Sequence, residues 1–197
     1  QDSSKIHYFK NIDPKIFADQ IKIIIDDFAD VKFIKIGMVS AIKNMQVICK
    51  TISQDINLII DPIISSTSKH EIVSAESLVY LQNTLLPRAF LLTPNINEAQ
   101  ILSGHKINNM KDAKIAANII KKMGVKNILI TGSHLNSKNI SHFLLKENGE
   151  SKIFQNKRLL LKKEVRGTGC AMSTAITCFL SKGYSLERAI QKANLFV

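Results

Sequence analysis

The sequence is poor in the residues and patterns that define several classes of protein. It has only three cysteines, Cys49, Cys170 and Cys178, which lack the spacing of zinc ligands and cannot all pair with one another. This usage fits a reducing compartment, so we expect a cytoplasmic protein. No apolar run reaches the length of a membrane span and no signal peptide is visible at Gln1, so we expect no membrane partner.

Acidic residues are in the minority, and the formal net charge is +11. Such a charge would suit a nucleic-acid partner. The lysines, however, are spread along the chain, and no long basic block or interleaving of basic and aromatic residues is present. We therefore expect no nucleic-acid partner, and a basic binding module is the weaker alternative. The positive charge can still attract anionic substrates.

The length of 197 residues predicts one domain over 1–197 with a substantial core. Asp13-Pro14 is a good helix start, and Ser40 is expected to cap a second helix that runs to about residue 51. Further helices are expected at 74–83, from about 96, at 111–123, after 167 and from 185. Expected strands are 31–36, 57–60, 89–92, 127–130 and a hairpin of 141–146 with 151–155. This alternation predicts an α/β fold with a doubly wound, mainly parallel sheet, flanked by helices, and a hairpin towards one edge.

Polar residues follow three of these strands where each strand ends. Asp61 follows one strand, Asn95 and Glu98 follow the next, and Thr131 and Gly132 follow a third. Ligands of such folds bind at the carboxyl ends of the strands. Each residue also has a purely structural explanation, as a turn former, a first-turn helix acid or a strand terminator. Together, two acids beside a phosphate-binding turn predict a site for Mg²⁺ and a nucleotide.

The phosphate-binding turn is Gly167-Thr168-Gly169-Cys170, which precedes a helix that continues through Leu180. Glycines at this place let free backbone N–H groups approach a ligand, and the helix dipole favours an anion there. Cys170 is expected in the first turn, where the same field favours the thiolate. The alternative is a plain junction between a loop and a helix with a buried cysteine.

Several segments resemble the ribokinase-like small-molecule kinases, and most closely the hydroxymethylpyrimidine/phosphomethylpyrimidine kinases of thiamine biosynthesis. Gly167-Thr168-Gly169-Cys170 is the most specific, because this subfamily commonly ends the motif in cysteine where other members have aspartate. The remaining matches are Lys35-Ile36-Gly37-Met38, Asp61-Pro62-Ile63-Ile64, Leu86-Pro87, Thr93-Pro94-Asn95-Ile96-Asn97-Glu98 and the isolated Gln1.

The resemblance implies transfer of the γ-phosphoryl group of ATP to a small-molecule pyrimidine, with Mg²⁺, in what is expected to be a homodimer. Cys170 would accept the proton of the substrate hydroxyl, and the backbone of Gly167, Thr168 and Gly169 would form the anion hole. The other implied roles are metal binding by Glu98, Asp61 and Asn95, pyrimidine binding by Gln1, Met38 and Ile63, and nucleotide binding by Thr131 and Gly132.

The chain also departs from the family pattern. Arg166, Thr67 and Thr131 stand where the family usually has histidine, lysine and lysine. If Gln1 aligns as proposed, the first strand and the glycine-rich substrate loop of the family lie outside this chain, as do a strand and a helix after Val197. Two alternatives follow, a pyridoxal kinase-like activity and a non-catalytic remnant of the same fold.

Overall fold

The computed structural model describes residues 10–28, 30–64, 73–132, 139–157 and 167–197. Among them, six strands form one sheet whose spatial order follows the sequence. The first four strands are parallel, and the last two form an antiparallel hairpin at one edge. The strands are β1 (Phe33–Ile36), β2 (Asn57–Ile60), β3 (Ala89–Leu92), β4 (Asn127–Thr131), β5 (Asn139–Leu145) and β6 (Ser151–Lys157). The expected mainly parallel sheet with an edge hairpin is confirmed.

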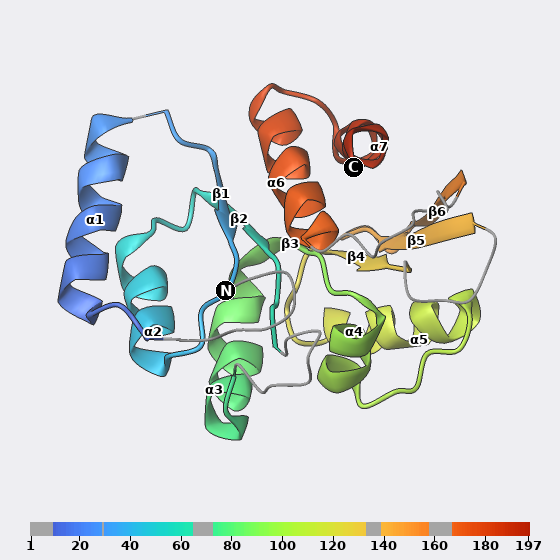
Figure 1. Cartoon of the computed structure of the whole chain (residues 1–197), viewed down its shortest axis with the longest axis horizontal. Helices are drawn as coiled ribbons and strands as arrows, with labels where there is room; N and C mark the ends of the chain where they lie inside the picture. The colour runs from blue at the N-terminus through green and yellow to red at the C-terminus, as the bar shows by residue number, and fades with distance from the viewer. Residues whose placement is uncertain (1–9, 29, 65–72, 133–138, 158–166) are drawn as a thin grey trace.

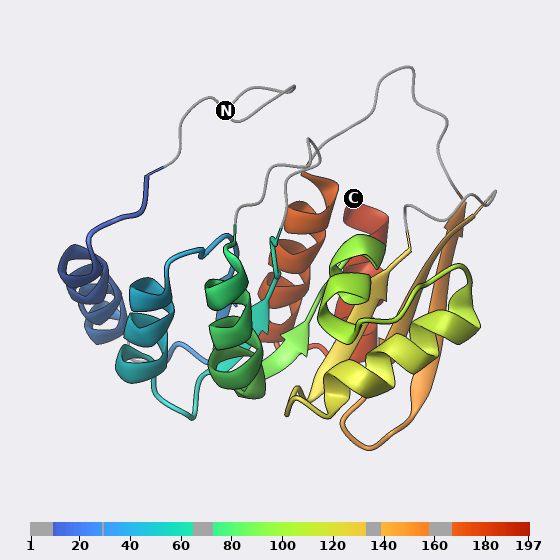
Figure 2. The ribbon, with the colours of Figure 1, turned by 90° about the horizontal axis from the view of Figure 1, so that it is seen from below.

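Helices cover both faces of the sheet, and each layer comes from one part of the chain (Figures 1 and 2). One layer holds α1 (Pro14–Asp27), α2 (Ile42–Thr51), α3 (Ala75–Tyr80), α4 (Ile96–Ser103) and α5 (Met110–Lys121). Right-handed crossovers between parallel strands laid down in sequence order keep α2 to α5 on this side. The other layer holds α6 (Thr168–Ser181) and α7 (Leu186–Phe196), which follow the hairpin.

The core is divided in the same way, because neighbouring strand residues point to opposite faces. On β2, Leu58 and Ile60 pack in the cluster beneath α2 to α5, whereas Ile59 packs with Met172 and Ile176 of α6. All three strand residues are buried. None of the helices in the described ranges is both long and apolar enough to cross a membrane.

The starts of α1 and α2 show where a local sequence signal predicts the N-cap of a helix correctly and where it does not. The Asp13 carboxylate accepts the backbone N–H groups of Lys15 and Ile16 at 2.9 and 3.2 Å, with Pro14 in the first turn, as expected. The expected cap of α2 by Ser40 is wrong. Ala41 is the N-cap and no side chain caps that helix. The Ser40 hydroxyl lies one residue too early and donates to Asn11 Oδ1 at 2.9 Å instead.

The C-terminal end of α2 is held by a side chain from the turn before β3. The Arg88 guanidinium donates to the carbonyl oxygens of Cys49, Ile52 and Ser53 at 3.1, 2.9 and 2.8 Å. The last carbonyls of a helix have no partner within the helix, so Arg88 supplies partners and matches the negative end of the dipole. α2 is thereby attached to the start of β3.

Candidate active site

The carboxyl ends of β1 to β4 bring the predicted polar residues to one edge of the sheet. The register aligns Ile36 with Ile60, and Leu92 with both Ile60 and Ile128, so the residues that follow these strands lie side by side. Asn95 and Thr131 form a parallel bridge just beyond the strands. The predicted convergence of Asp61, the Asn95–Glu98 segment and Thr131 is therefore observed.

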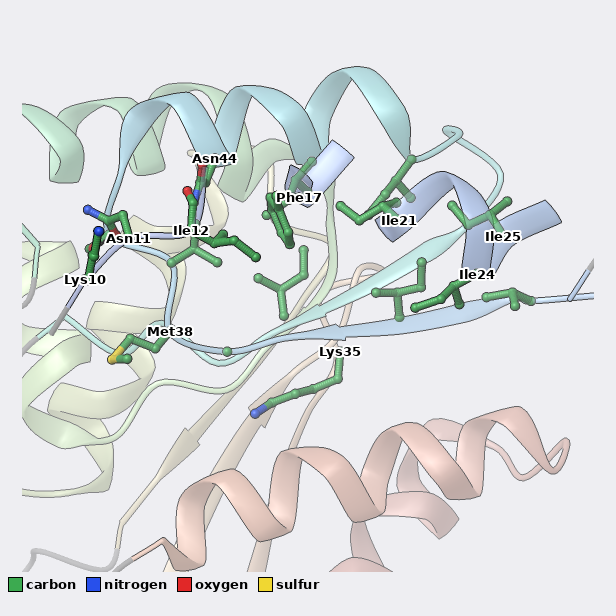
Figure 3. Close-up of a pocket in the computed structure, with 18 residues that line it drawn as sticks. Lys10, Asn11, Ile12, Phe17, Ile21, Ile24, Ile25, Lys35, Met38 and Asn44 are labelled. Atoms are coloured by element: carbon green, nitrogen blue, oxygen red, sulfur yellow. Dashed lines mark hydrogen bonds between the residues drawn. The ribbon is translucent and has the colours of Figure 1, made fainter. Parts of the chain in front are cut away.

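Asp61 is the centre of a buried polar cluster that joins three elements. It is 5% exposed, and its Oδ2 accepts the hydroxyl of Ser173 on α6 at 3.1 Å. The Nζ of Lys35 on β1 lies 3.5 Å from the same oxygen. The side chain of Lys35 points from β1 toward α6 (Figure 3). Asp61 thus ties β1, β2 and α6 together at the edge where the ligand is expected.

Lys35 and Ser173 were not assigned roles from the sequence, although one signal was available for Lys35. It is the one charged residue in the strand Phe33–Ile36, and its position alternates with Ile34 and Ile36, which pack beneath α1 and α2. A charged residue on the inner face of a strand needs a partner. No comparable sequence pattern marks Ser173, which is fully buried on an apolar helix.

Glu98 is held by a reciprocal cap at the start of α4. Its Oε2 accepts the backbone N–H of Asn95 at 2.8 Å, and Asn95 Oδ1 accepts the backbone N–H of Glu98 at 3.0 Å. The pKa of Glu98 is raised to about 8, mainly by burial; the nearby charge of Asp61 contributes to the rise and the hydrogen bond from Asn95 opposes it. At neutral pH this carboxyl group keeps its proton. Asn95 positions Glu98, and its direct role toward a metal stays a prediction.

Asp61 and Glu98 suit a cation whose other ligands are mainly water molecules and substrate phosphates. In the part of the chain that the structure describes, no group of three or more His, Cys, Asp or Glu residues could hold a metal ion. Mg²⁺ usually keeps several waters and binds one or two carboxylates together with substrate phosphates. Asp61 and Glu98 are close enough for the charge of one to act on the other, so a cation near both would favour the ionised form of Glu98. They fit Mg²⁺ and do not fit an all-protein metal centre.

The N-terminus of α6 offers an open anion site at the same edge. Gly167 is its N-cap with φ of 83°, a left-handed conformation that favours glycine, and no side chain caps the helix. A Cβ added to Gly169 would meet nothing within 4 Å. Gly167, Thr168 and Gly169 are all exposed, so the N–H groups of the first turn are open to a ligand. The predicted phosphate-binding turn therefore has the required shape.

Cys170 lies in the first turn of α6, but the expectation that the helix favours its thiolate is wrong here. The pKa of the thiol is raised to about 11, mainly by burial and also by the charge of Asp61 and a hydrogen bond to that carboxylate. Lys35 acts in the opposite direction. A negative charge beside a thiol disfavours a second one, and this outweighs the helix dipole. In the free protein Cys170 is a thiol that faces Asp61.

The predicted pyrimidine-binding residues are placed unevenly. Met38 follows β1, is 45% exposed and lines one end of an apolar groove of about 510 Å³ between α1, α2 and β1 (Figure 3). Ile63 is half-buried and follows β2, with its N–H donating to the carbonyl of Asp61 at 2.9 Å. Both lie at the correct edge of the sheet. Gln1 lies outside the described residues, as do Thr67 and Arg166.

The predicted nucleotide-binding residues have structural roles of their own. Thr131 is buried and its N–H donates to the carbonyl of Pro94 at 2.9 Å. A Cβ added to Gly132 would lie 1.9 Å from the carbonyl oxygen of Ser141, so the approach of β5 requires glycine. Thr131 also lines a cavity of about 220 Å³ with His142, Thr168 and Gly169. Contact of Thr131 and Gly132 with a nucleotide stays a prediction.

Known proteins are similar to this chain in both sequence and architecture. The sequence model of the phosphomethylpyrimidine kinase family matches residues 1–197. A hydroxymethylpyrimidine/phosphomethylpyrimidine kinase of Aquifex aeolicus is 32% identical over the whole chain, which covers 77% of that relative. A Staphylococcus aureus protein with the same name is 31% identical, with 72% of it covered.

Two solved structures extend the comparison. The crystal structure of a phosphomethylpyrimidine kinase from Clostridium difficile 630 has a TM-score of 0.84 and 29% identity, with all of this chain and 80% of that chain covered. The ADP complex of a Bacillus subtilis pyridoxal kinase also has a TM-score of 0.84, with 27% identity, and the match covers 95% of this chain and 70% of that one.

Proposed function

The chain belongs to the phosphomethylpyrimidine kinase family and is a phosphotransferase, and we propose that it phosphorylates 4-amino-5-hydroxymethyl-2-methylpyrimidine, its monophosphate, or both, with ATP, in thiamine diphosphate biosynthesis. The observation that carries this proposal is the open N-terminus of α6 beside Asp61 and Glu98. That arrangement joins an anion site to two carboxyl groups at one edge of the sheet.

Phosphoryl transfer depends mainly on positioning and on stabilisation of charge. The N–H groups of Gly167 to Cys170 would hold the transferring phosphoryl group, because they are uncapped and lie at the positive end of the helix. Glu98 and Asp61 would hold Mg²⁺, with Asn95 keeping Glu98 in place. When bound, Mg²⁺ neutralises charge on the phosphates and on the two acids.

The proton of the substrate hydroxyl requires an acceptor at the same place. The Cys170 thiol hydrogen-bonds the Asp61 carboxylate and carries its own proton at neutral pH. We propose that the sulfur takes the hydroxyl proton as the proton it already holds passes to the Asp61 carboxylate. Lys35 and Ser173 fix that carboxylate by contacts of 3.5 and 3.1 Å. Each step moves one proton, and no free thiolate is required beforehand.

The remaining assignments extend the same proposal. Met38 and Ile63 would pack against the pyrimidine and Gln1 would hydrogen-bond it, while Thr131 and Gly132 would contact the nucleotide. A cytoplasmic homodimer is supported by the family resemblance alone. Pyridoxal kinase activity is the second candidate, because a structure of that name shares the fold at 27% identity.

The test is a substrate panel with the purified protein that carries this chain. We expect ATP consumption with hydroxymethylpyrimidine or its monophosphate, only when Mg²⁺ is present, and much less with pyridoxal. Greater turnover of pyridoxal would favour the second candidate. Nucleotide binding without turnover of any of these substrates would favour the non-catalytic alternative.

A further inference from the structure

The ammonium group of Lys35 lies within the candidate site, and Asp61 engages it only in part. Its Nζ is 3.5 Å from Asp61 Oδ2, which is longer than the about 2.7–2.9 Å of a charge-assisted hydrogen bond. An ammonium group has three N–H donors, and a contact with one oxygen uses at most one of them. The side chain of Lys35 is 21% exposed, so the remaining donors can reach a ligand.

This ammonium group lies between the proposed pyrimidine-binding segment and the start of α6. A Cβ added to Gly37 would lie 3.1 Å from Lys35 Nζ, so the side chain passes over the backbone just before Met38. The side chain points toward α6 (Figure 3). The charge of Lys35 lowers the pKa of Cys170 against the larger effects that raise it, so this charge acts at the first turn of that helix. An acceptor group on the pyrimidine must reach the same place to meet the transferring phosphoryl group.

The two proposed acceptors differ in the charge that they bring to this place. The hydroxymethyl group of the pyrimidine is neutral, whereas a phosphate monoester carries a charge of about −1.5 to −2 at pH 7. A phosphate beside the buried Asp61 carboxylate is repelled unless positive donors face it. The proposed Mg²⁺ is shared with the phosphates of ATP, so the phosphate of the acceptor needs a further cation. Lys35 offers one beside Asp61.

We propose that Lys35 Nζ donates hydrogen bonds to the phosphate group of the pyrimidine monophosphate and so determines that this site accepts a phosphorylated substrate. This inference rests on the proposed function and deepens it, because it assigns recognition of the second acceptor to one side chain. One N–H of Lys35 stays with Asp61, and the other two face the phosphate. In the transfer, an oxygen of that phosphate bonds to the γ-phosphorus of ATP, and the bond that breaks releases ADP. Lys35 keeps its own protons throughout.

The test measures kcat and KM for each acceptor with saturating ATP and Mg²⁺, in the purified protein that carries this chain. Lys35→Met keeps an unbranched side chain of similar length and removes the charge. The loss of a partner for Asp61 would by itself affect both acceptors by the same factor. We expect in addition that the KM of the monophosphate rises about 10–100-fold relative to the KM of hydroxymethylpyrimidine. Lys35→Arg keeps the charge and should restore most of the difference between the acceptors.

Lys32→Met is the matched control, because it removes the same charge from an exposed lysine just before β1, at the end of that strand opposite to the site. Both KM values should stay within twofold of those of the unmodified protein. Calorimetry without nucleotide gives a measurement that does not depend on turnover. The monophosphate should bind the unmodified protein more tightly than hydroxymethylpyrimidine does, and Lys35→Met should remove this difference.

The outcomes separate this inference from the proposed function. If Lys35→Met weakens the binding and turnover of both acceptors by the same factor, Lys35 acts only through Asp61 and the inference is wrong. Lys35→Gln, which keeps an N–H donor without the charge, provides the same comparison if Lys35→Met does not fold. Binding of the monophosphate that depends on Lys35, without phosphoryl transfer to either pyrimidine, would support the inference and contradict the proposed function. A protein that binds neither pyrimidine would contradict both.

Discussion

The neutral, buried state of His142 predicts a specific loss of stability in acid. Its pKa is lowered from 6.5 to about 4 in the folded protein. Below pH 6.5 the unfolded chain therefore binds a proton that the folded protein does not, and stability falls as the pH falls. At about 1.4 kcal/mol for each pH unit, the full effect is about 3 kcal/mol, reached near pH 4.

The substitution His142→Phe should remove this dependence without a large cost at pH 7. Phenylalanine has a similar size and cannot bind a proton, and it also eliminates the Nδ1 of His142, which has no hydrogen-bond partner among the described residues. The measurement is the free energy of unfolding in urea, followed by circular dichroism at intervals from pH 4.5 to 7.5. The difference between the variant and the unmodified protein should change in favour of the variant by about 2–3 kcal/mol across this range.

The control is His105→Phe, which removes another histidine with an unpartnered ring nitrogen among the described residues and retains His142 and its effect. Its free energy of unfolding should follow that of the unmodified protein as the pH falls. If the curves of His142→Phe and the unmodified protein run parallel from pH 7.5 to 4.5, the buried ring is not the source of acid sensitivity.

Substitutions at three further residues test the site and the scaffold. Cys170→Ala should leave nucleotide binding close to normal, because the anion site consists of backbone N–H groups. It should reduce turnover by about 10²–10⁴-fold, whereas Cys170→Asp should retain part of the activity. Glu98→Gln should lose most turnover but keep its unfolding free energy at pH 7, where the Glu98 carboxyl is already protonated; full activity, or activity in excess chelator, would contradict the metal assignment. Arg88→Met should lower the unfolding free energy by about 2–4 kcal/mol, because three carbonyl oxygens at the C-terminal end of α2 and just beyond it lose a charged donor. An unchanged urea midpoint would show that Arg88 is dispensable.

Local signals were enough to predict most helices and strands. Asp13-Pro14 and Ser185 each begin a helix as expected, because a side-chain acceptor followed by free N–H groups is a contact within four residues. Asn148-Gly149 closes the hairpin, with Gly149 at φ of 87°. Ser40 failed as a cap because its hydroxyl binds Asn11, which is 29 residues away in the sequence. The competing partner could not be identified from the residues around Ser40.

The site was predictable in its location but not in its electrostatics. Parallel strands bring their carboxyl ends together, which was sufficient to place Asp61, Asn95 and Glu98 at one edge. The bond from Ser173 to Asp61 joins residues that are 112 apart in the sequence. Such a contact depends on how α6 lies across β1 and β2, and no local pattern encodes it. The protonation states of Glu98 and Cys170 depend on that same packing.

Cys170 is a thiol although it stands at a helix N-terminus, because the effects that oppose its negative charge are larger than the effect of the helix dipole. A helix terminus stabilises a negative charge by about 0.3–1 kcal/mol at an exposed position. The shift of the Cys170 pKa from 9.0 to about 11 opposes the thiolate by at most about 3 kcal/mol, before solvent screening of this half-buried group reduces the figure. Burial and Asp61 therefore outweigh the helix. The same carboxylate raises the pKa of Glu98, so the free site holds a proton on each of these two groups. Positive charge near Asp61 would lower the pKa of both groups, so the proposed binding of Mg²⁺ and the phosphoryl donor would be coupled to the protonation of Glu98 and Cys170.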